Sequence, residues 1–138
     1  MQHRELRRAV ERLHGDERGS APAEFAMVGA LLTILTLSVM QLGLALFIRN
    51  TVVDAAAEGA RFGALADSSA EGGIARARDL ITTALGPSYA SDITAATGSY
   101  LGHPAMIVTV RTPLPLIGLV GIEDGLEVSG RAAIETLD

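Results

Sequence analysis

The sequence predicts an α+β protein. A long N-terminal helix, whose first half spans the membrane, is followed by a second helix and a small antiparallel sheet head. Three observations predict it: an uncharged run of 24 residues over 25–48, an amphipathic pattern over 73–85, and alternating apolar residues towards the C-terminus. With 138 residues, the chain has room for only one small domain besides the helix.

Composition excludes several classes of function. The chain has no cysteine, so it forms no disulfide, thiolate metal site or cysteine nucleophile. A net charge of −5, 4% aromatic residues and the lack of a basic stripe argue against a nucleic-acid partner. His103 is expected in a surface loop, and the acid pair Glu123-Asp124 in a solvated turn. We therefore expect no catalytic residue, no metal, no cofactor and no small-molecule substrate.

The uncharged run is predicted to cross a membrane. As a helix it is about 36 Å long at about 1.5 Å per residue, and a bilayer core is about 30 Å thick. The alternative is a buried helix of a soluble protein, but the rest of the chain is too short to surround a helix that is apolar on every face. Inside the run, Thr33, Thr36 and Ser38 are expected to donate hydrogen bonds to carbonyls of their own helix.

The distribution of arginines predicts the orientation of this segment. Residues 1–19 contain five arginines, whereas only Arg49 and Arg61 follow the run over a similar distance. Cytoplasmic flanks of membrane helices carry the excess of positive charge, so the N-terminus is expected inside and the C-terminus outside. The run is too long for the apolar core of a secretory signal, so we expect the helix to be retained.

The membrane border, from Asp16 to Phe25, carries the most informative residues. Gly19 is expected to be a flexible break, since glycine accepts extended and turn conformations readily. Pro22 suits the first turn of a new helix, and Glu24 falls in that turn, near the positive end of the helix dipole. Taken alone, these residues mark the start of a membrane helix.

The same residues resemble a known family. A charged leader, then Gly19, four residues, and Glu24-Phe25 opening an apolar helix is similar to the processing site of type IV pilin-like proteins. More narrowly, this context and the alanine-rich segment 54–64 resemble the TadE-like minor pilins, or pseudopilins, of tight-adherence (Flp-type) pili. The resemblance is good over residues 16–66 and holds only in outline for the rest. Family members often carry a proline shortly after Glu-Phe, where this chain has Gly29.

The resemblance implies roles for four residues. A prepilin peptidase would cut between Gly19 and Ser20, and Ser20 would carry the new α-amine. Glu24, with Phe25 beside it, would dock against the amine of a neighbouring subunit, which is mostly cationic because its pKa is near 8. The implied partners are this peptidase, other pilin subunits and the lipid bilayer. The implied location is the bacterial cytoplasmic membrane, with incorporation in a surface pilus as a further step.

The domain organisation expected from these arguments has three parts. Residues 1–19 form a cytoplasmic leader, residues 20–66 a long helix with its transmembrane part over 25–48 and an extracytoplasmic stalk, and residues 67–138 a small α+β head. On the stalk, Asp54, Glu58 and Arg61 share one face. A stripe of mostly small residues packs either on the chain's own head or in a filament; it comprises Val52, Ala56, Gly59, Phe62 and Gly63.

In the head, the second helix is expected over 73–85, ended by Gly86-Pro87. Strands are expected over 106–111, from Leu126 onwards and, more weakly, near Ile93. Asp124-Gly125 is predicted to be a hairpin turn. The segment 113–120, with two prolines and an apolar run, is predicted to be a connection that is packed in the core or, alternatively, contacts the bilayer surface or a partner subunit.

Two functions remain open from the sequence. The first is a minor pilin that is processed by a prepilin peptidase and acts in the assembly or structure of a tight-adherence pilus. The second is a membrane-tethered binding or accessory module with an extracytoplasmic domain, which is never cleaved and never polymerises.

Overall fold

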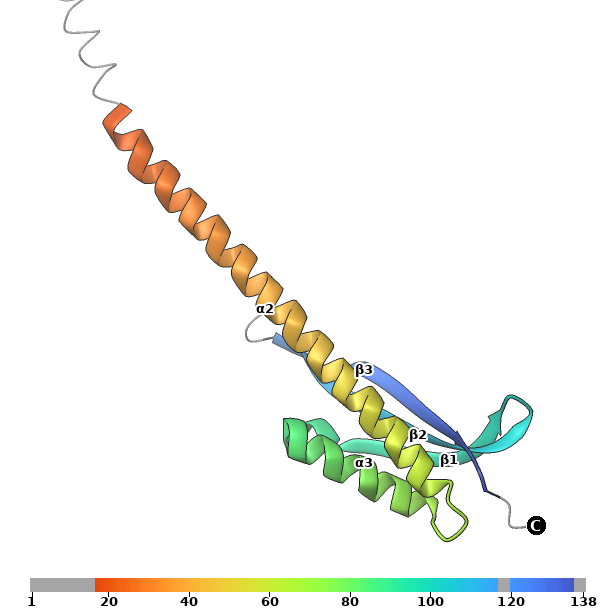
Figure 1. Cartoon of the computed structure of the whole chain (residues 1–138). Helices are drawn as coiled ribbons and strands as arrows, with labels where there is room; N and C mark the ends of the chain where they lie inside the picture. Colours follow the sequence, from red (N-terminus) through yellow and green to blue (C-terminus); the bar gives the residue numbers. More distant parts are fainter. Residues whose placement is uncertain (1–16, 117–119, 136–138) are drawn as a thin grey trace, which may run out of the picture. The chain divides into compact units, whose positions relative to one another are not determined.

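The computed structural model of the chain describes residues 17–116 and 120–135 (Figure 1). The elements follow in the order α2 (Glu17–Gly63), α3 (Ala70–Leu85), η1 (Pro87–Ala90), β1 (Asp92–Tyr100), β2 (His103–Leu116) and β3 (Val120–Ala133). A long apolar helix, a second helix and a three-stranded sheet confirm the predicted α+β class. The chain divides into two compact units, one ending at Met40 and the other beginning at Gln41, and α2 contributes to both.

The first half of α2 is the one described helix that is long and apolar enough to cross a membrane, judged by length and composition. Its large apolar side chains are exposed along the whole unit, with Phe25 80% and Met40 65% accessible. The hydroxyls of Thr33, Thr36 and Ser38 each donate to the carbonyl four residues earlier, at 2.8 Å. The prediction that these polar side chains satisfy themselves within the helix is thus confirmed.

The start of α2 differs from the prediction. The helix begins at Glu17, so Gly19 is helical and is not a break, and Pro22 lies inside the helix and not in its first turn. Proline lacks only the hydrogen bond from its own nitrogen to the carbonyl four residues back, that of Arg18. Because the neighbouring residues are good helix formers, the helix continues through this single missing bond.

The sheet is an antiparallel meander in the order β1-β2-β3. The weak strand expected near Ile93 is β1. Strand β2 starts at His103, three residues earlier than expected, so this histidine is exposed in a strand and pairs with Tyr100 instead of lying in a loop. The two-residue turn between them has Leu101 at φ 51° and Gly102 at φ 80°. Two positive φ values are the geometry that matches the twist of a tight hairpin.

The predicted hairpin turn at Asp124-Gly125 is wrong, because both residues lie within β3. The predicted connection also belongs largely to strands, with Pro113 and Pro115 in β2; residues 117–119 lie outside the described residues. Strand β2 tolerates these prolines because β1 pairs only as far as Arg111, which leaves one edge of β2 free. Opposite Pro113, three residues of β3 replace one, which is a bulge.

Helix α3 starts at Ala70, three residues earlier than predicted, and ends before Gly86 at φ 101° as expected. The earlier start has a local cause. Ser69 has an extended backbone, and its hydroxyl accepts a hydrogen bond at 3.2 Å from the backbone N–H of Gly72, which is the geometry of an N-cap. Because the cap lies before Gly72-Gly73, the helix includes both glycines in its first turn.

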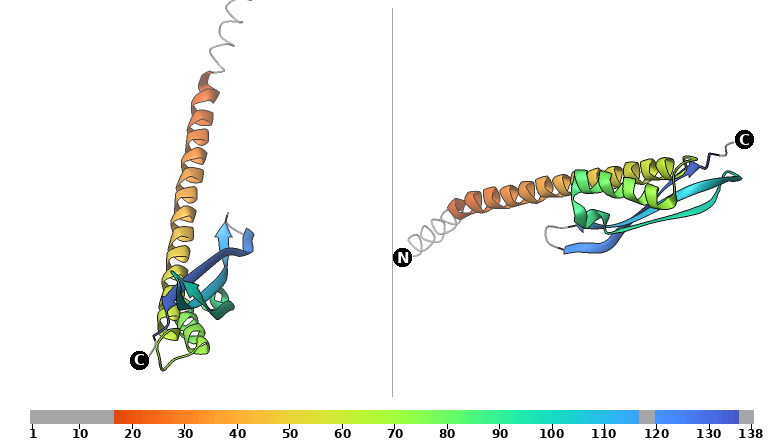
Figure 2. Two further views of the ribbon diagram at one scale, coloured as in Figure 1. Left: turned by 90° about the vertical axis from the view of Figure 1, so that its right-hand side faces the viewer. Right: turned by 90° about the horizontal axis from the view of Figure 1, so that it is seen from below.

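The core lies between one face of the sheet and the two helices, α3 and the second half of α2 (Figure 2). The sheet contributes alternate residues, as predicted for the strands; these are Ile93, Met106, Val108, Val110, Leu126 and Val128. From α2, Val52, Ala56, Gly59 and Gly63 of the predicted stripe are buried, whereas Phe62 is 42% exposed. Of the two alternatives for the stripe, packing on the chain's own head is therefore confirmed.

Replacement of Ser69 by alanine is expected to destabilise the head by about 1 kcal/mol, because the N–H of Gly72 loses its capping partner. Urea unfolding of the full-length protein in detergent micelles, followed by pulse proteolysis, measures this loss. Exposed Ser99 in β1 provides the control, since Ser99→Ala removes the same atom without a helix cap. Equal effects of the two substitutions would contradict the capping role.

The same helix start predicts a pH dependence. Its own backbone N–H and the Ser69 hydroxyl hold the pKa of Glu71 below its ordinary value of 4.5. The ionised carboxylate therefore stabilises the folded state above pH 4.5, and this contribution disappears as the pH falls through the lowered value. We expect Glu71→Gln to lose less stability than the parent chain on acidification, measured as the change in Tm. An unchanged acid dependence would show that this contact contributes nothing.

Candidate functional site

The membrane-border segment, residues 19–25, occupies the first turns of α2. All of its side chains are exposed, and a Cβ placed on Gly19 would meet no atom within 4 Å. The local sequence explains the helix, since Ala21, Ala23 and Glu24 are good helix formers next to the tolerated proline. Nothing within the described chain covers this segment, so its chemistry is open to a second molecule.

Two of the four predicted site residues are in contact. The Ser20 hydroxyl donates a hydrogen bond of 2.7 Å to Oε1 of Glu24, one helical turn later. This bond places both groups on the same face of α2 and holds the carboxylate beside the backbone of Ser20. Gly19 precedes this pair and Phe25 follows it, and neither takes part in the bond.

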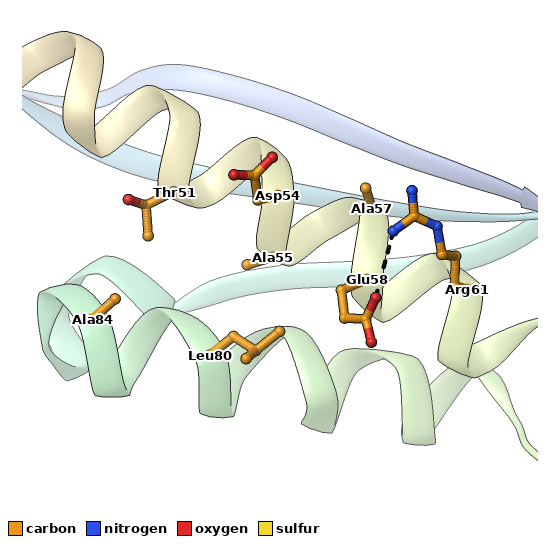
Figure 3. Close-up of a pocket in the computed structure, with 8 residues that line it drawn as sticks. All are labelled: Thr51, Asp54, Ala55, Ala57, Glu58, Arg61, Leu80 and Ala84. Atoms are coloured by element: carbon orange, nitrogen blue, oxygen red, sulfur yellow. Dashed lines mark hydrogen bonds and ion pairs between the residues drawn. The ribbon is translucent and has the colours of Figure 1, made fainter.

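A second candidate feature is a groove of about 450 Å³ between α2 and α3 (Figure 3). Helix α2 contributes polar and charged residues, and α3 contributes Leu80 and Ala84. Asp54, Glu58 and Arg61 line the groove together, as their spacing on one helix face predicts. No histidine is among the residues that line the groove.

Glu58 in this groove forms ion pairs with two arginines. Glu58 Oε2 lies 3.5 Å from Nη1 of Arg61, and its Oε1 lies 3.8 Å from Nη2 of Arg76 in α3. The sequence analysis did not identify Arg76, because only packing of the two helices brings it to Glu58. Half-exposed pairs of this kind contribute at most about 1 kcal/mol each, so they orient α3 on α2 more than they hold it there.

The described part of the chain holds no cluster of three or more metal-type side chains. His103, the one histidine that the structure describes, is exposed in β2, far along the chain from the helix border and absent from the groove lining. The two candidate features therefore offer a carboxylate–hydroxyl pair on an apolar helix and a shallow groove that contains an ion-paired glutamate. Both suit contacts with another polypeptide.

Comparison with known proteins covers the border segment and the α2 side of the groove. Residues 19–61 match the family described as TadE-like protein. This segment is TadE-like. The TadE-like segment starts at Gly19, contains Ser20, Glu24 and the apolar run, and ends at Arg61 in the groove. Comparisons with curated proteins and with solved structures found no match.

The TadE-like segment lies within α2 and includes the whole apolar run. Its apolar helix fits single-pass anchoring in a membrane. An apolar surrounding such as lipid fits this helix, because large apolar side chains are exposed along it.

Proposed function

We propose that this chain is a minor pilin, or pseudopilin, of a tight-adherence pilus. In this proposal a prepilin peptidase cuts the precursor between Gly19 and Ser20, removes residues 1–19, and leaves the rest anchored with its head outside the cytoplasmic membrane. The observation that carries the proposal is the TadE-like segment, which starts at the glycine of the processing motif and runs through the apolar helix.

The proposed mechanism uses the apolar helix twice. In the bilayer, lipid surrounds side chains such as Phe25 and Met40, and in a filament the helices of neighbouring subunits take the place of lipid. Cleavage creates an α-amine on Ser20 with a pKa near 8, so it is cationic at neutral pH. This amine and a Glu24 carboxylate of the next subunit neutralise one another in the packed bundle, whereas an unpaired charge there would be costly.

The hydrogen bond between Ser20 and Glu24 gives the carboxylate a defined position before assembly. Because the hydroxyl occupies only one oxygen of the carboxylate, the remaining lone pairs stay available to accept hydrogen bonds from an incoming amine. Docking then adds a charge-assisted bond to a side chain that is already ordered on its own helix.

The second candidate is the uncleaved, membrane-tethered binding or accessory module. One observation favours it: α2 begins at Glu17, so the bond between Gly19 and Ser20 lies in a helix. A protease draws its substrate into an extended conformation, and the helix must unwind locally before the peptidase cuts.

The intact mass of the protein, purified from membranes of its native host with and without the resident prepilin peptidase, distinguishes the two functions. The proposal expects a peptidase-dependent loss of residues 1–19, with Ser20 at the new N-terminus. A chain that keeps Met1 in both strains would overturn the proposal and leave the tethered module.

Gly19→Ala is expected to slow cleavage about two- to fivefold, because alanine favours the helix over the extended form by about 0.5–1 kcal/mol relative to glycine. The added Cβ meets no atom within 4 Å, so the fold does not change. A time course of precursor and mature forms measures the rate. Gly43→Ala is the matched control, since it is as open and lies away from the motif; equal rates for both would contradict the role of Gly19.

A further inference from the structure

We propose that the turn between β1 and β2 in one copy of the chain docks in the groove between α2 and α3 of a second copy. The turn, called the tip from here on, comprises residues 100–103, and the groove is the one drawn in Figure 3. Both surfaces belong to the compact unit that begins at Gln41. The proposal goes beyond the proposed function and does not depend on cleavage at Gly19.

The first support is the residue at the centre of the tip. Leu101 has φ 51°, and within residues 17–116 and 120–135 it is the one residue other than glycine with a positive φ. Side chains disfavour this conformation, and tight hairpin turns usually carry asparagine, aspartate or glycine there. The same leucine is 81% exposed. It is therefore unfavourable both for the backbone and in water, and contact with an apolar surface would offset these costs.

The tip presents more apolar surface than this leucine alone. Tyr100 beside it is 44% exposed, and residues 93–102 contain no charged side chain. Figures 1 and 2 show the turn between β1 and β2 extending beyond the end of α2 at Gly63. A protruding apolar side chain of this kind serves as an anchor when another molecule offers a recess for it.

The position of the tip selects a protein, and not lipid, as its partner. The N–H of Ile134 donates to the carbonyl of Pro104, and the N–H of Glu135 donates to that of Ala64, each at 3.0 Å. These two bonds bring the tip level with the C-terminal end of α2. The apolar run ends at Ile48, which is 16 residues of helix, or about 24 Å, before Ala64.

The groove between α2 and α3 is a recess with apolar walls. Its lining includes buried Ala55 and half-buried Leu80, and Ala84 adds an exposed methyl group (Figure 3). Because the two alanines are small, the helices leave about 450 Å³ open between them. Clefts with apolar walls and a few polar groups are the usual sites of docking. Insertion of Leu101 would remove apolar surface from water on both copies.

Charge complementarity selects a second copy as the occupant. Asp54 lines the groove and forms no hydrogen bond or ion pair with the residues that the structure describes. Next to the tip, the guanidinium of Arg131 lies 5.9 Å from the centre of the Tyr100 ring and has no carboxylate partner in the described ranges. Docking of the tip brings this cation to the carboxylate, and such pairing favours the correct partner and orientation.

The two surfaces suit copies whose α2 helices run in the same direction. The tip is level with Ala64, and the α2 side of the groove spans residues 51–61. A shift of 3–13 residues, or about 5–20 Å along α2, therefore aligns the tip of one copy with the groove of the next. A contact between two different surfaces is head-to-tail, so each pair leaves one tip and one groove for further copies.

The absence of cysteine from the chain allows a test by cross-linking between chosen positions. Two single-cysteine variants of the full-length protein, made in a host without prepilin peptidase and carrying different tags, are mixed in liposomes and treated with a short bismaleimide. His103→Cys marks the tip and Ala84→Cys marks the groove, and both positions are exposed. In the control mixture, Thr94→Cys on the exposed face of β1 replaces His103→Cys.

The product that joins residue 103 to residue 84 is expected to form several-fold more than the control product that joins residue 94 to residue 84. Adding Leu101→Asn to the tip variant is expected to lower the yield at least about tenfold, because the apolar anchor is lost. Asparagine accepts a positive φ more readily than leucine, so urea unfolding should show a head of equal or greater stability. A residue with a merely structural role would not combine these two results.

Reversal of the charges tests the choice of partner. Asp54→Arg in the groove variant is expected to lower the yield several-fold, because it faces Arg131 of the tip variant with a like charge. Arg131→Asp in the tip variant is then expected to restore the yield. A yield that stays unchanged with Asp54→Arg, or that the reversed pair does not restore, would overturn the choice of a second copy.

Three other outcomes would overturn the proposal. Equal yields in the tip and control mixtures, or a yield that Leu101→Asn leaves unchanged, would show that the tip does not dock in the groove. A dominant product between two residues 103 would indicate a tip-to-tip contact. Quenching by doxyl lipids of a fluorophore on His103→Cys would identify lipid as the occupant. Because the host lacks the peptidase, none of these results bears on cleavage, which the intact mass decides.

Discussion

Replacement of Gly130 by alanine is expected to cost the head about 3 kcal/mol of its free energy of unfolding, the largest effect of any single methyl group added to the described chain. A Cβ on Gly130 would overlap the carbonyl of Ala56 and the backbone nitrogen of Ala57 in α2. Helix backbone cannot move aside as a side chain can, so either β3 or α2 must shift. Pulse proteolysis of the full-length protein across a urea series measures the change.

Gly98→Ala is the matched control for this substitution. Gly98 also lies in a strand, but its added Cβ would meet only Cδ1 of Ile107, the end of a flexible side chain, at 2.7 Å. We expect Gly98→Ala to change the free energy of unfolding by about 1 kcal/mol or less. If the two variants unfold at the same urea concentration, close packing of β3 on α2 does not stabilise the head.

Replacement of Glu24 by alanine is expected to leave membrane insertion intact and to impair pilus assembly or partner association strongly. In the proposed filament the substitution leaves the amine of a neighbouring Ser20 unpaired among packed helices. Removing one partner of a buried charge pair costs about 3–5 kcal/mol, which is more than about a hundredfold in the docking equilibrium. Piliation counts and co-purification of pilin subunits measure the loss.

Ser20→Ala provides the control for Glu24→Ala, because it removes the hydrogen bond to Glu24 and keeps both the α-amine and the carboxylate. We expect it to retain most of the assembly that Glu24→Ala loses. Normal piliation with Glu24→Ala would remove this residue from the mechanism, and an equal defect in both variants would assign the effect to the hydroxyl bond and not to the charge.

The sequence predicted those parts of the fold that depend on local periodicity. The uncharged run corresponds to a helix with exposed apolar side chains. The amphipathic pattern and the alternation of Leu126, Val128 and Gly130 correspond to elements whose apolar face is buried. Errors occurred where a local signal competed with pairing to a distant strand. Asp124-Gly125 resembles a turn. In the structure β3 pairs with β2 on both sides of these residues, which belong to the bulge opposite Pro113.

In the candidate sites too, features that depend on local spacing could be predicted, and features that depend on long-range packing could not. The helical spacing of Ser20 and Glu24 makes their hydrogen bond a local property, and the shared face of Asp54, Glu58 and Arg61 is equally local. The contact of Glu58 with Arg76 and the groove between the helices arise only when α3 packs on α2, which no spacing along the chain encodes. The helical conformation of Gly19 was not predicted, because the prediction considered the flexibility of glycine and not the helix-forming residues Ala21, Ala23 and Glu24 that follow it.

The close contacts between α2 and the rest of the head have a mechanical consequence. Gly59 meets the carbonyl of Gly73 in α3, and Gly130 meets the backbone of Ala56, so neighbouring main chains touch without intervening side chains. Because β3 runs alongside α2, a pull along the helix axis loads these contacts in shear, where they must all yield together. A force along the second half of α2 would therefore reach α3 and β3 through several backbone contacts at once.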